Sequence, residues 1–169
     1  DWNLGKIVSF KLDNTELAQD VPSGFLARDV NADSDFYAFR DGECPELNLK
    51  LNAETDANED YVGISGNLTD TTGKDRAVTL IFALPIDAVG WKWHDDVRHS
   101  KEIKDGQEYV NGVNIHTGSN GIMSLYPFAN ISNQHGLTIA LDMDMPAQYR
   151  IACNASTKQF YIAYDFGLT

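Results

Sequence analysis

The sequence has no long apolar run. A helix that crosses a bilayer needs roughly 18 or more consecutive apolar residues, and the longest apolar stretch, 77–85, is interrupted by Thr79. We therefore expect no membrane partner. The composition is otherwise ordinary for a globular domain, with 43% hydrophobic and 22% charged residues, which argues against disorder.

Basic residues are scarce. The chain has 13 Lys and Arg against 25 Asp and Glu, which gives a formal net charge of −12. A surface this negative repels phosphate backbones, so nucleic acid is not an expected partner. The charge suits a secreted or cell-surface protein with a neutral or cationic ligand, or with bound calcium.

The chain has only two cysteines, Cys44 and Cys153. Two are too few for a zinc site built from paired C-x-x-C motifs. Two interpretations stay open. Either a disulfide joins an early loop to a late strand, or both residues are buried free thiols that pack as small apolar side chains.

Motifs that carry common enzyme chemistry are also absent. The four histidines form no H-E-x-x-H pattern, and there is no G-x-S-x-G, phosphate-binding glycine loop or dinucleotide fingerprint. Carboxylate pairs such as Asp142 and Asp144 are expected by chance among so many acidic residues. We therefore predict a domain that is not itself an enzyme and requires no cofactor.

What the sequence does contain is hydrophobic alternation with period two, which indicates β-strands. Leu47, Leu49 and Leu51 alternate with polar residues. The predicted strands are 47–51, 61–68, 76–84, 109–116, 121–131, 136–142, 147–153 and 159–166. A turn signal about every ten residues is typical of a sandwich or barrel. The fold prediction is all-β, an antiparallel two-sheet sandwich of jelly-roll or supersandwich type, formed by a single domain over 1–169.

Two finer predictions concern the middle and the end of the chain. Segment 76–84 is apolar on both faces, which predicts a central strand. The turn signal at 71–74 predicts that this strand forms a hairpin with 61–68. The strand-like sequence that runs to Thr169 suggests a boundary within a longer, multidomain polypeptide.

The most suggestive local feature is a pair of tryptophans, Trp91 and Trp93. Residues two apart in a strand share a face, so both indoles would form a platform for sugar rings. The remaining candidate sugar contacts are polar neighbours and two tyrosines: His94, Asp95, Asp96, Arg98, Tyr109 and Tyr126. The alternative for the tryptophans is core packing, because an indole buries a large area.

Alternating acidic and amide residues at Asp29, Asn31, Asp33 and Asp35 resemble the start of a calcium loop. The segment departs from the EF-hand pattern, which has Gly at position six and Glu at position twelve. Here those positions hold Ser34 and Arg40. We therefore weigh a structural calcium ion against a solvated loop with Asx turns.

Several short motifs occur in a suggestive order. An apolar strand ends in Leu84-Pro85, followed by Gly90-Trp91-Lys92-Trp93, then Tyr126-Pro127 and Gly136-Leu137. This order resembles the N-terminal β-sandwich domains, of galactose-mutarotase-like or supersandwich form, that precede the catalytic barrel of large bacterial glycoside hydrolases. The resemblance spans about 60–169 and implies an accessory domain that binds carbohydrate or supports the barrel.

Three functional hypotheses follow. The first is a non-catalytic carbohydrate-binding module that targets an attached glycoside hydrolase to a polysaccharide. The second is a structural sandwich domain without a ligand of its own, and the third is a standalone polysaccharide-degrading enzyme. Exposed tryptophans would favour the first hypothesis, whereas buried tryptophans with an apolar patch elsewhere would favour the second.

Overall fold

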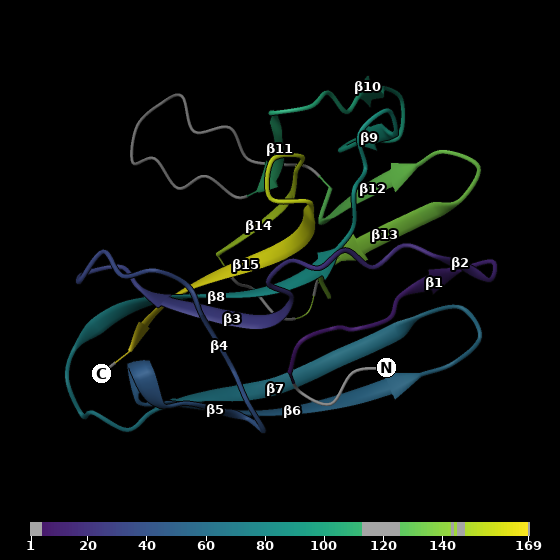
Figure 1. Cartoon of the computed structure of the whole chain (residues 1–169). Helices are drawn as coiled ribbons and strands as arrows, with labels where there is room; N and C mark the ends of the chain where they lie inside the picture. The colour runs from purple at the N-terminus through teal and green to yellow at the C-terminus, as the bar shows by residue number, and fades with distance from the viewer. Residues whose placement is uncertain (1–4, 113–125, 143, 145–147, 169) are drawn as a thin grey trace, which may run out of the picture.

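The computed structural model describes residues 5–112, 126–142, 144 and 148–168. Over these residues the chain forms antiparallel strands and one 3-10 turn, η1 (Pro45–Leu47), with no α-helix. The all-β prediction is confirmed (Figure 1). Predicted strands 109–116, 121–131 and 147–153 lie partly outside the described residues, and their described parts overlap β11, β12 and β14.

The largest sheet has six strands in the order β11-β14-β15-β8-β3-β4. Its strands are β11 (Glu108–Gly112), β14 (Tyr149–Asn154), β15 (Gln159–Leu168), β8 (Arg76–Pro85), β3 (Gly24–Asp29) and β4 (Tyr37–Ala38). All neighbouring strands pair antiparallel, and β8 pairs with β15 along its whole length. The prediction of a central strand at 76–84 is therefore confirmed.

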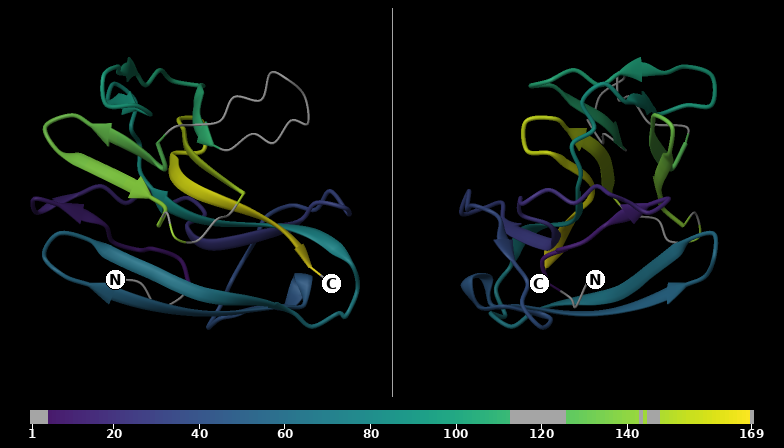
Figure 2. Two further views of the ribbon diagram at one scale, coloured as in Figure 1. Left: turned by 180° about the vertical axis from the view of Figure 1, so that it is seen from behind. Right: turned by 45° about the vertical axis from the view of Figure 1, so that its right-hand side comes forward.

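Three smaller units form the opposing layer. The first is a sheet of order β10-β9-β12-β13, the second is the hairpin β1-β2, and the third is a sheet of order β5-β6-β7. Their bounds are β1 (Lys11–Leu12), β2 (Thr15–Glu16), β5 (Glu43–Cys44), β6 (Leu49–Ala57), β7 (Val62–Asp70), β9 (Lys92–His94), β10 (Lys101–Glu102), β12 (Phe128–Ser132) and β13 (Gly136–Ala140). The hairpin lies between the two small sheets (Figure 2).

The side chains of β8 point alternately to the two faces of the large sheet, and this alternation explains the arrangement. Val78 and Leu80 belong to the core under the three-stranded sheet, whereas Leu84 packs on the core under the four-stranded sheet. Phe82 contacts both cores. These side chains share one face of the strand, so both small sheets cover the same side of the large sheet. We call this side the inner face, and the opposite side the outer face.

The predicted hairpin of 61–68 with 76–84 is wrong. Strand β7 pairs with β6, and β8 pairs with β15 and β3. The turn at 71–74 instead carries the chain from one layer to the other. The reason is that β8 is apolar on both faces, and this pattern favours a position between two strands of a buried sheet.

The two cysteines lie in different core clusters and are free thiols. Cys44 on β5 packs under the three-stranded sheet, and Cys153 on β14 packs under the four-stranded sheet. Burial raises the pKa of the Cys153 thiol to about 12. The disulfide alternative is therefore wrong, and the alternative of two buried thiols is confirmed.

The β6-β7 hairpin extends beyond the core as an exposed arm. Leu49 and Leu51 are buried, but the strand residues after Ala53 are exposed. The segment 56–60, which repeats the spacing of the calcium-like loop, covers the end of β6 and most of the turn of this hairpin. The Asn58 side chain accepts hydrogen bonds from the backbone N–H groups of Asp60 and Tyr61, at 2.8 and 3.0 Å.

Two glycines on β7 give a matched test of this hairpin. A Cβ at Gly66 would lie 2.3 Å from the carbonyl oxygen of Asn52, whereas a Cβ at Gly63 would meet nothing closer than 3.5 Å. We expect Gly66→Ala to lower the free energy of unfolding by about 1–3 kcal/mol through overpacking. Gly63→Ala should change it by at most about 0.5 kcal/mol. Urea unfolding of both variants measures the difference, and equal effects would contradict the described register.

No helix within the described part of the chain is long and apolar enough to cross a membrane.

Candidate functional site

Both candidate tryptophans lie in the protein core. Trp93 on β9 is 1% exposed and Trp91, just before that strand, is 8% exposed. The Trp93 ring packs edge-on against Phe160, with 6.3 Å between ring centroids. The two indoles do share a face, but it is the inward one, because the alternate residue Lys92 is exposed. The expected open platform is therefore not formed.

Most polar neighbours of these tryptophans form contacts within the loop that follows β9. The Asp96 carboxylate accepts hydrogen bonds from the His99 ring, at 2.9 Å, and from the backbone N–H groups of Arg98 and His99. These contacts lower the pKa of Asp96 to about 2. His94 Nε2 lies 3.0 Å from Ser132 Oγ. Asp95 is half-buried and Arg98 is exposed.

The two candidate tyrosines are both partly buried. The Tyr109 hydroxyl donates to the carbonyl of Glu102 at 2.7 Å and accepts from the backbone N–H of Lys104 at 3.1 Å. Its ring packs against Trp93, with 6.2 Å between centroids. The Tyr126 ring packs against Phe128 at 5.8 Å. Tyr109 thus connects the core to the loop before β11.

The segment that resembles a calcium loop forms a loop in which side chains contact other groups of the chain. Asp29 accepts from the backbone N–H of Ala32, at 2.9 Å, and pairs with Arg76 at 3.3 Å. Asn31 accepts from the backbone N–H of Ala77 at 2.6 Å. No group of three His, Cys, Asp or Glu side chains in the described ranges could hold a metal ion. Calcium at Asp29, Asn31, Asp33 and Asp35 stays a prediction, and the contacts favour the Asx-turn alternative.

The outer face of the six-stranded sheet carries the other notable group of side chains. No described sheet packs against this face, as the right-hand view in Figure 2 shows. Its centre is an apolar floor formed by Leu26, Ile81, Ala83 and Ala163, each at most 5% exposed. Larger polar and aromatic side chains from β3, β14 and β15 surround this floor.

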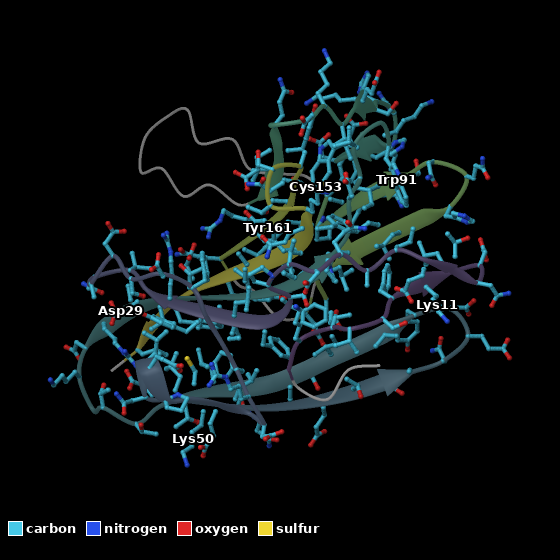
Figure 3. The ribbon with its side chains drawn as sticks, viewed as in Figure 1. Lys11, Asp29, Lys50, Trp91, Cys153 and Tyr161 are labelled. Carbon is cyan, nitrogen blue, oxygen red and sulfur yellow. The ribbon has the colours of Figure 1, made fainter. Side chains whose placement is uncertain are left out.

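Tyr161, which is labelled in Figure 3, packs against one side of the floor. Its direct neighbours across the sheet are Ala152 and Ala83, which are too short to cover its ring. The Tyr161 hydroxyl donates to Glu108 at 2.8 Å, and the Asn154 amide donates to the same carboxylate oxygen at 3.2 Å. Burial and this hydrogen bond raise the pKa of Tyr161, so its hydroxyl stays protonated.

A hydrogen-bonded trio lies at the opposite side of the floor. Asp165 on β15 accepts from Arg150 Nη1 at 2.5 Å through one oxygen and from Thr79 Oγ1 at 2.7 Å through the other. Both carboxylate oxygens are therefore occupied. The side chains of Arg150 and Asp165 are 38% and 35% exposed, so part of each remains accessible to solvent.

Arg28 completes the surrounding ring of side chains. It lies on β3 next to Thr79 of β8, and its guanidinium carbon is 5.4 Å from the centroid of the Phe36 ring. Arg28 Nε is shielded from solvent and has no hydrogen-bond partner. We call Arg28, Phe36, Arg150, Tyr161 and Asp165, with their apolar floor, the outer-face cluster.

This cluster offers two kinds of contact to a ligand that lies flat on the sheet. The aromatic rings and the apolar floor suit the C–H face of a small ring, and the arginines donate hydrogen bonds to oxygen atoms. Sequence reasoning placed strand 159–166 correctly but did not assign its faces. The sequence pattern that could have assigned the two faces of this strand is Tyr161, Ala163 and Asp165. These residues are less apolar than the residues that alternate with them.

A second exposed feature is the β6-β7 arm. Tyr61, Val62 and Ile64 are 58%, 63% and 37% exposed. Val62 and Ile64 share the face of β7 that carries Leu68 toward the core. The arm therefore continues the apolar face of β7 beyond the core.

No known protein family, curated protein or solved structure matched the chain in comparisons of its sequence and fold.

Proposed function

We propose that the chain is a non-catalytic carbohydrate-binding sandwich domain whose ligand lies on the outer-face cluster. The observation that carries the proposal is the position of Tyr161 between two alanines, with an ordered Arg150–Asp165 pair on the opposite side of the apolar floor. An aromatic ring with a few oriented polar groups around it is the usual composition of a small-molecule site.

The chemistry of a sugar fits these groups. A pyranose presents an apolar C–H face, which would cover the Tyr161 ring, and a rim of hydroxyl groups. Those hydroxyls would accept hydrogen bonds from arginine N–H groups and donate to the Glu108 carboxylate. The family resemblance supports the further proposal of a secreted or cell-surface domain that works beside an attached glycoside hydrolase.

Replacing Tyr161 tests the proposal. We expect Tyr161→Ala to weaken binding of a soluble polysaccharide about tenfold, because ring contacts of this kind contribute about 0.5–1.5 kcal/mol beyond the area they bury. Tyr161→Phe keeps the ring and should stay within about threefold. Isothermal titration calorimetry against a panel of soluble polysaccharides gives the affinities.

The matched control for this test is Tyr61→Ala, which removes an exposed tyrosine from the arm and should leave binding unchanged. Circular dichroism of each variant checks that it is folded. If no polysaccharide binds the wild-type chain, or if Tyr61→Ala alone weakens binding, the proposal fails.

A second candidate is a structural domain that docks against its neighbour through the arm. The buried tryptophans and the exposed side chains of Tyr61, Val62 and Ile64 favour it, since contiguous apolar surface often marks an interaction site. The acidic residues of the arm, Glu54, Asp56, Glu59 and Asp60, specify a partner surface that is apolar with basic residues around it. A flat response to every polysaccharide would favour this candidate over sugar binding.

A further inference from the structure

Arg28 is placed in an unusual electrostatic setting. The chain has 25 acidic residues and only 13 lysines and arginines, so most basic groups have an acidic neighbour available. The arginines at positions 40, 76 and 150 each form an ion pair. The Arg28 side chain has no ion pair and no hydrogen bond among the described residues, although it is half-buried and its Nε is shielded from solvent. Arg98, the other arginine without a described ion pair, is exposed.

The surroundings of Arg28 hold its guanidinium in place without neutralising it. The Phe36 ring contacts it at 5.4 Å, which stabilises a cation through the ring electrons. The nearest acidic group along the same row of the sheet is Asp165, and Thr79 lies between them. Both oxygens of Asp165 already accept hydrogen bonds from Arg150 and Thr79. An anion that pairs with Arg28 must therefore come from outside these residues.

We propose that the saccharide bound by the outer-face cluster is acidic, and that Arg28 binds its carboxylate. This inference rests on the proposed function and names the class of its ligand, a uronic acid. A guanidinium presents N–H donors in a planar fork that matches the two oxygens of a carboxylate. Arg28 and Tyr161 lie on opposite sides of the apolar floor, so one sugar residue would contact the ring while its carboxylate faces the arginine.

The charge of the protein as a whole opposes the binding of an acidic sugar. A net charge of −12 disfavours the approach of any anion. Specific retention of an acidic sugar then requires a local cation that has no internal partner. Arg28 meets this requirement, whereas Arg76 is held by two carboxylates of the protein itself.

The test compares uronate oligosaccharides with their own methyl esters. Oligomers of galacturonate, glucuronate and mannuronate are titrated into the wild-type chain, each beside the fully methyl-esterified form, which keeps the ring and removes the charge. We expect at least one acid to bind about 10–100-fold more tightly than its ester, the range for a charge-assisted hydrogen bond.

Three variants complete the design. Arg28→Gln should remove the preference for the acid, so that acid and ester bind with similar affinity, and Arg28→Lys should keep part of the preference. Tyr161→Ala should weaken acid and ester equally. Tyr161-dependent binding with no preference for any acid would overturn this inference and leave the proposed function intact. No binding of any saccharide would overturn both.

Discussion

Replacing Trp93 by alanine is expected to lower the free energy of unfolding by about 3–5 kcal/mol, the usual cost of truncating a large buried aromatic residue. Trp93 is 1% exposed, and its ring lies within 6.3 Å of both the Tyr109 and the Phe160 ring centroids. Removal of the indole leaves a cavity between the six-stranded and four-stranded sheets. Urea unfolding followed by far-UV circular dichroism measures the loss.

Two further substitutions make this result specific. Trp93→Phe keeps most of the ring volume and removes an indole N–H that has no hydrogen-bond partner, so we expect a loss of at most about 2 kcal/mol. Val97→Ala changes a side chain that is 69% exposed and should cost at most about 0.5 kcal/mol. A Trp93→Ala protein as stable as the wild type would place the indole at the surface, contrary to the structure.

Replacing Arg76 by alanine is expected to cost about 3–5 kcal/mol, because it leaves buried carboxylates unpaired. Arg76 pairs with Asp70 at 2.6 Å and Asp29 at 3.3 Å, and its Nη2 donates to the carbonyl of Leu47 at 2.5 Å. The side chains of the three charged residues are 6–14% exposed. This group joins the ends of β7, β3 and η1 at the start of β8.

An exposed ion pair serves as the matched control for Arg76. Lys50 and Glu43 lie 3.0 Å apart but are 62% and 58% exposed, so Lys50→Ala should cost less than about 1 kcal/mol. Chemical unfolding of both variants gives the comparison. Equal losses would show that the Arg76 group is solvated rather than buried.

The Arg76 group also has a pH dependence of known sign. Burial alone would raise the pKa of Asp70, but the hydrogen bonds from Arg76 and Thr72 outweigh it and lower that pKa below its usual value. An aspartate with a lowered native pKa stabilises the fold above its unfolded pKa of about 3.9, and this stability is lost as the pH falls through its native pKa. In Arg76→Ala that acid-dependent loss should be smaller.

The local patterns of the sequence predicted the long strands that correspond to β6, β7, β8, β13 and β15, because alternation depends only on which residues face a core. They did not predict β3, whose first four residues are all buried and therefore do not alternate. Leu49 and Leu51 alternate with exposed Lys50 and Asn52, as the pattern indicated. The pairing of strands was not predictable in the same way. The turn at 71–74 has the composition of a hairpin turn, yet it joins two layers, since the partners of β8 lie far away in the sequence.

The candidate site shows the same limit more sharply. Alternation correctly placed Trp91 and Trp93 on one face, but only tertiary packing decides whether that face is open or buried. Arg28 lies on β3, which is far in the sequence from the hairpin of β14 and β15 that carries Arg150 and Tyr161. Nothing in their local patterns indicates that they surround one apolar floor.

The most direct test of the account is a two-dimensional amide NMR titration of the wild-type chain with the saccharide that binds most tightly. We predict that shifts concentrate at the amides of Arg28, Thr79, Arg150, Tyr161 and Asp165, while the indole N–H signal of Trp93 stays unchanged. Shifts confined to Trp91, Trp93 and the loop after β9, or to the arm at 61–64, with the six-stranded sheet unperturbed, would contradict the outer-face site.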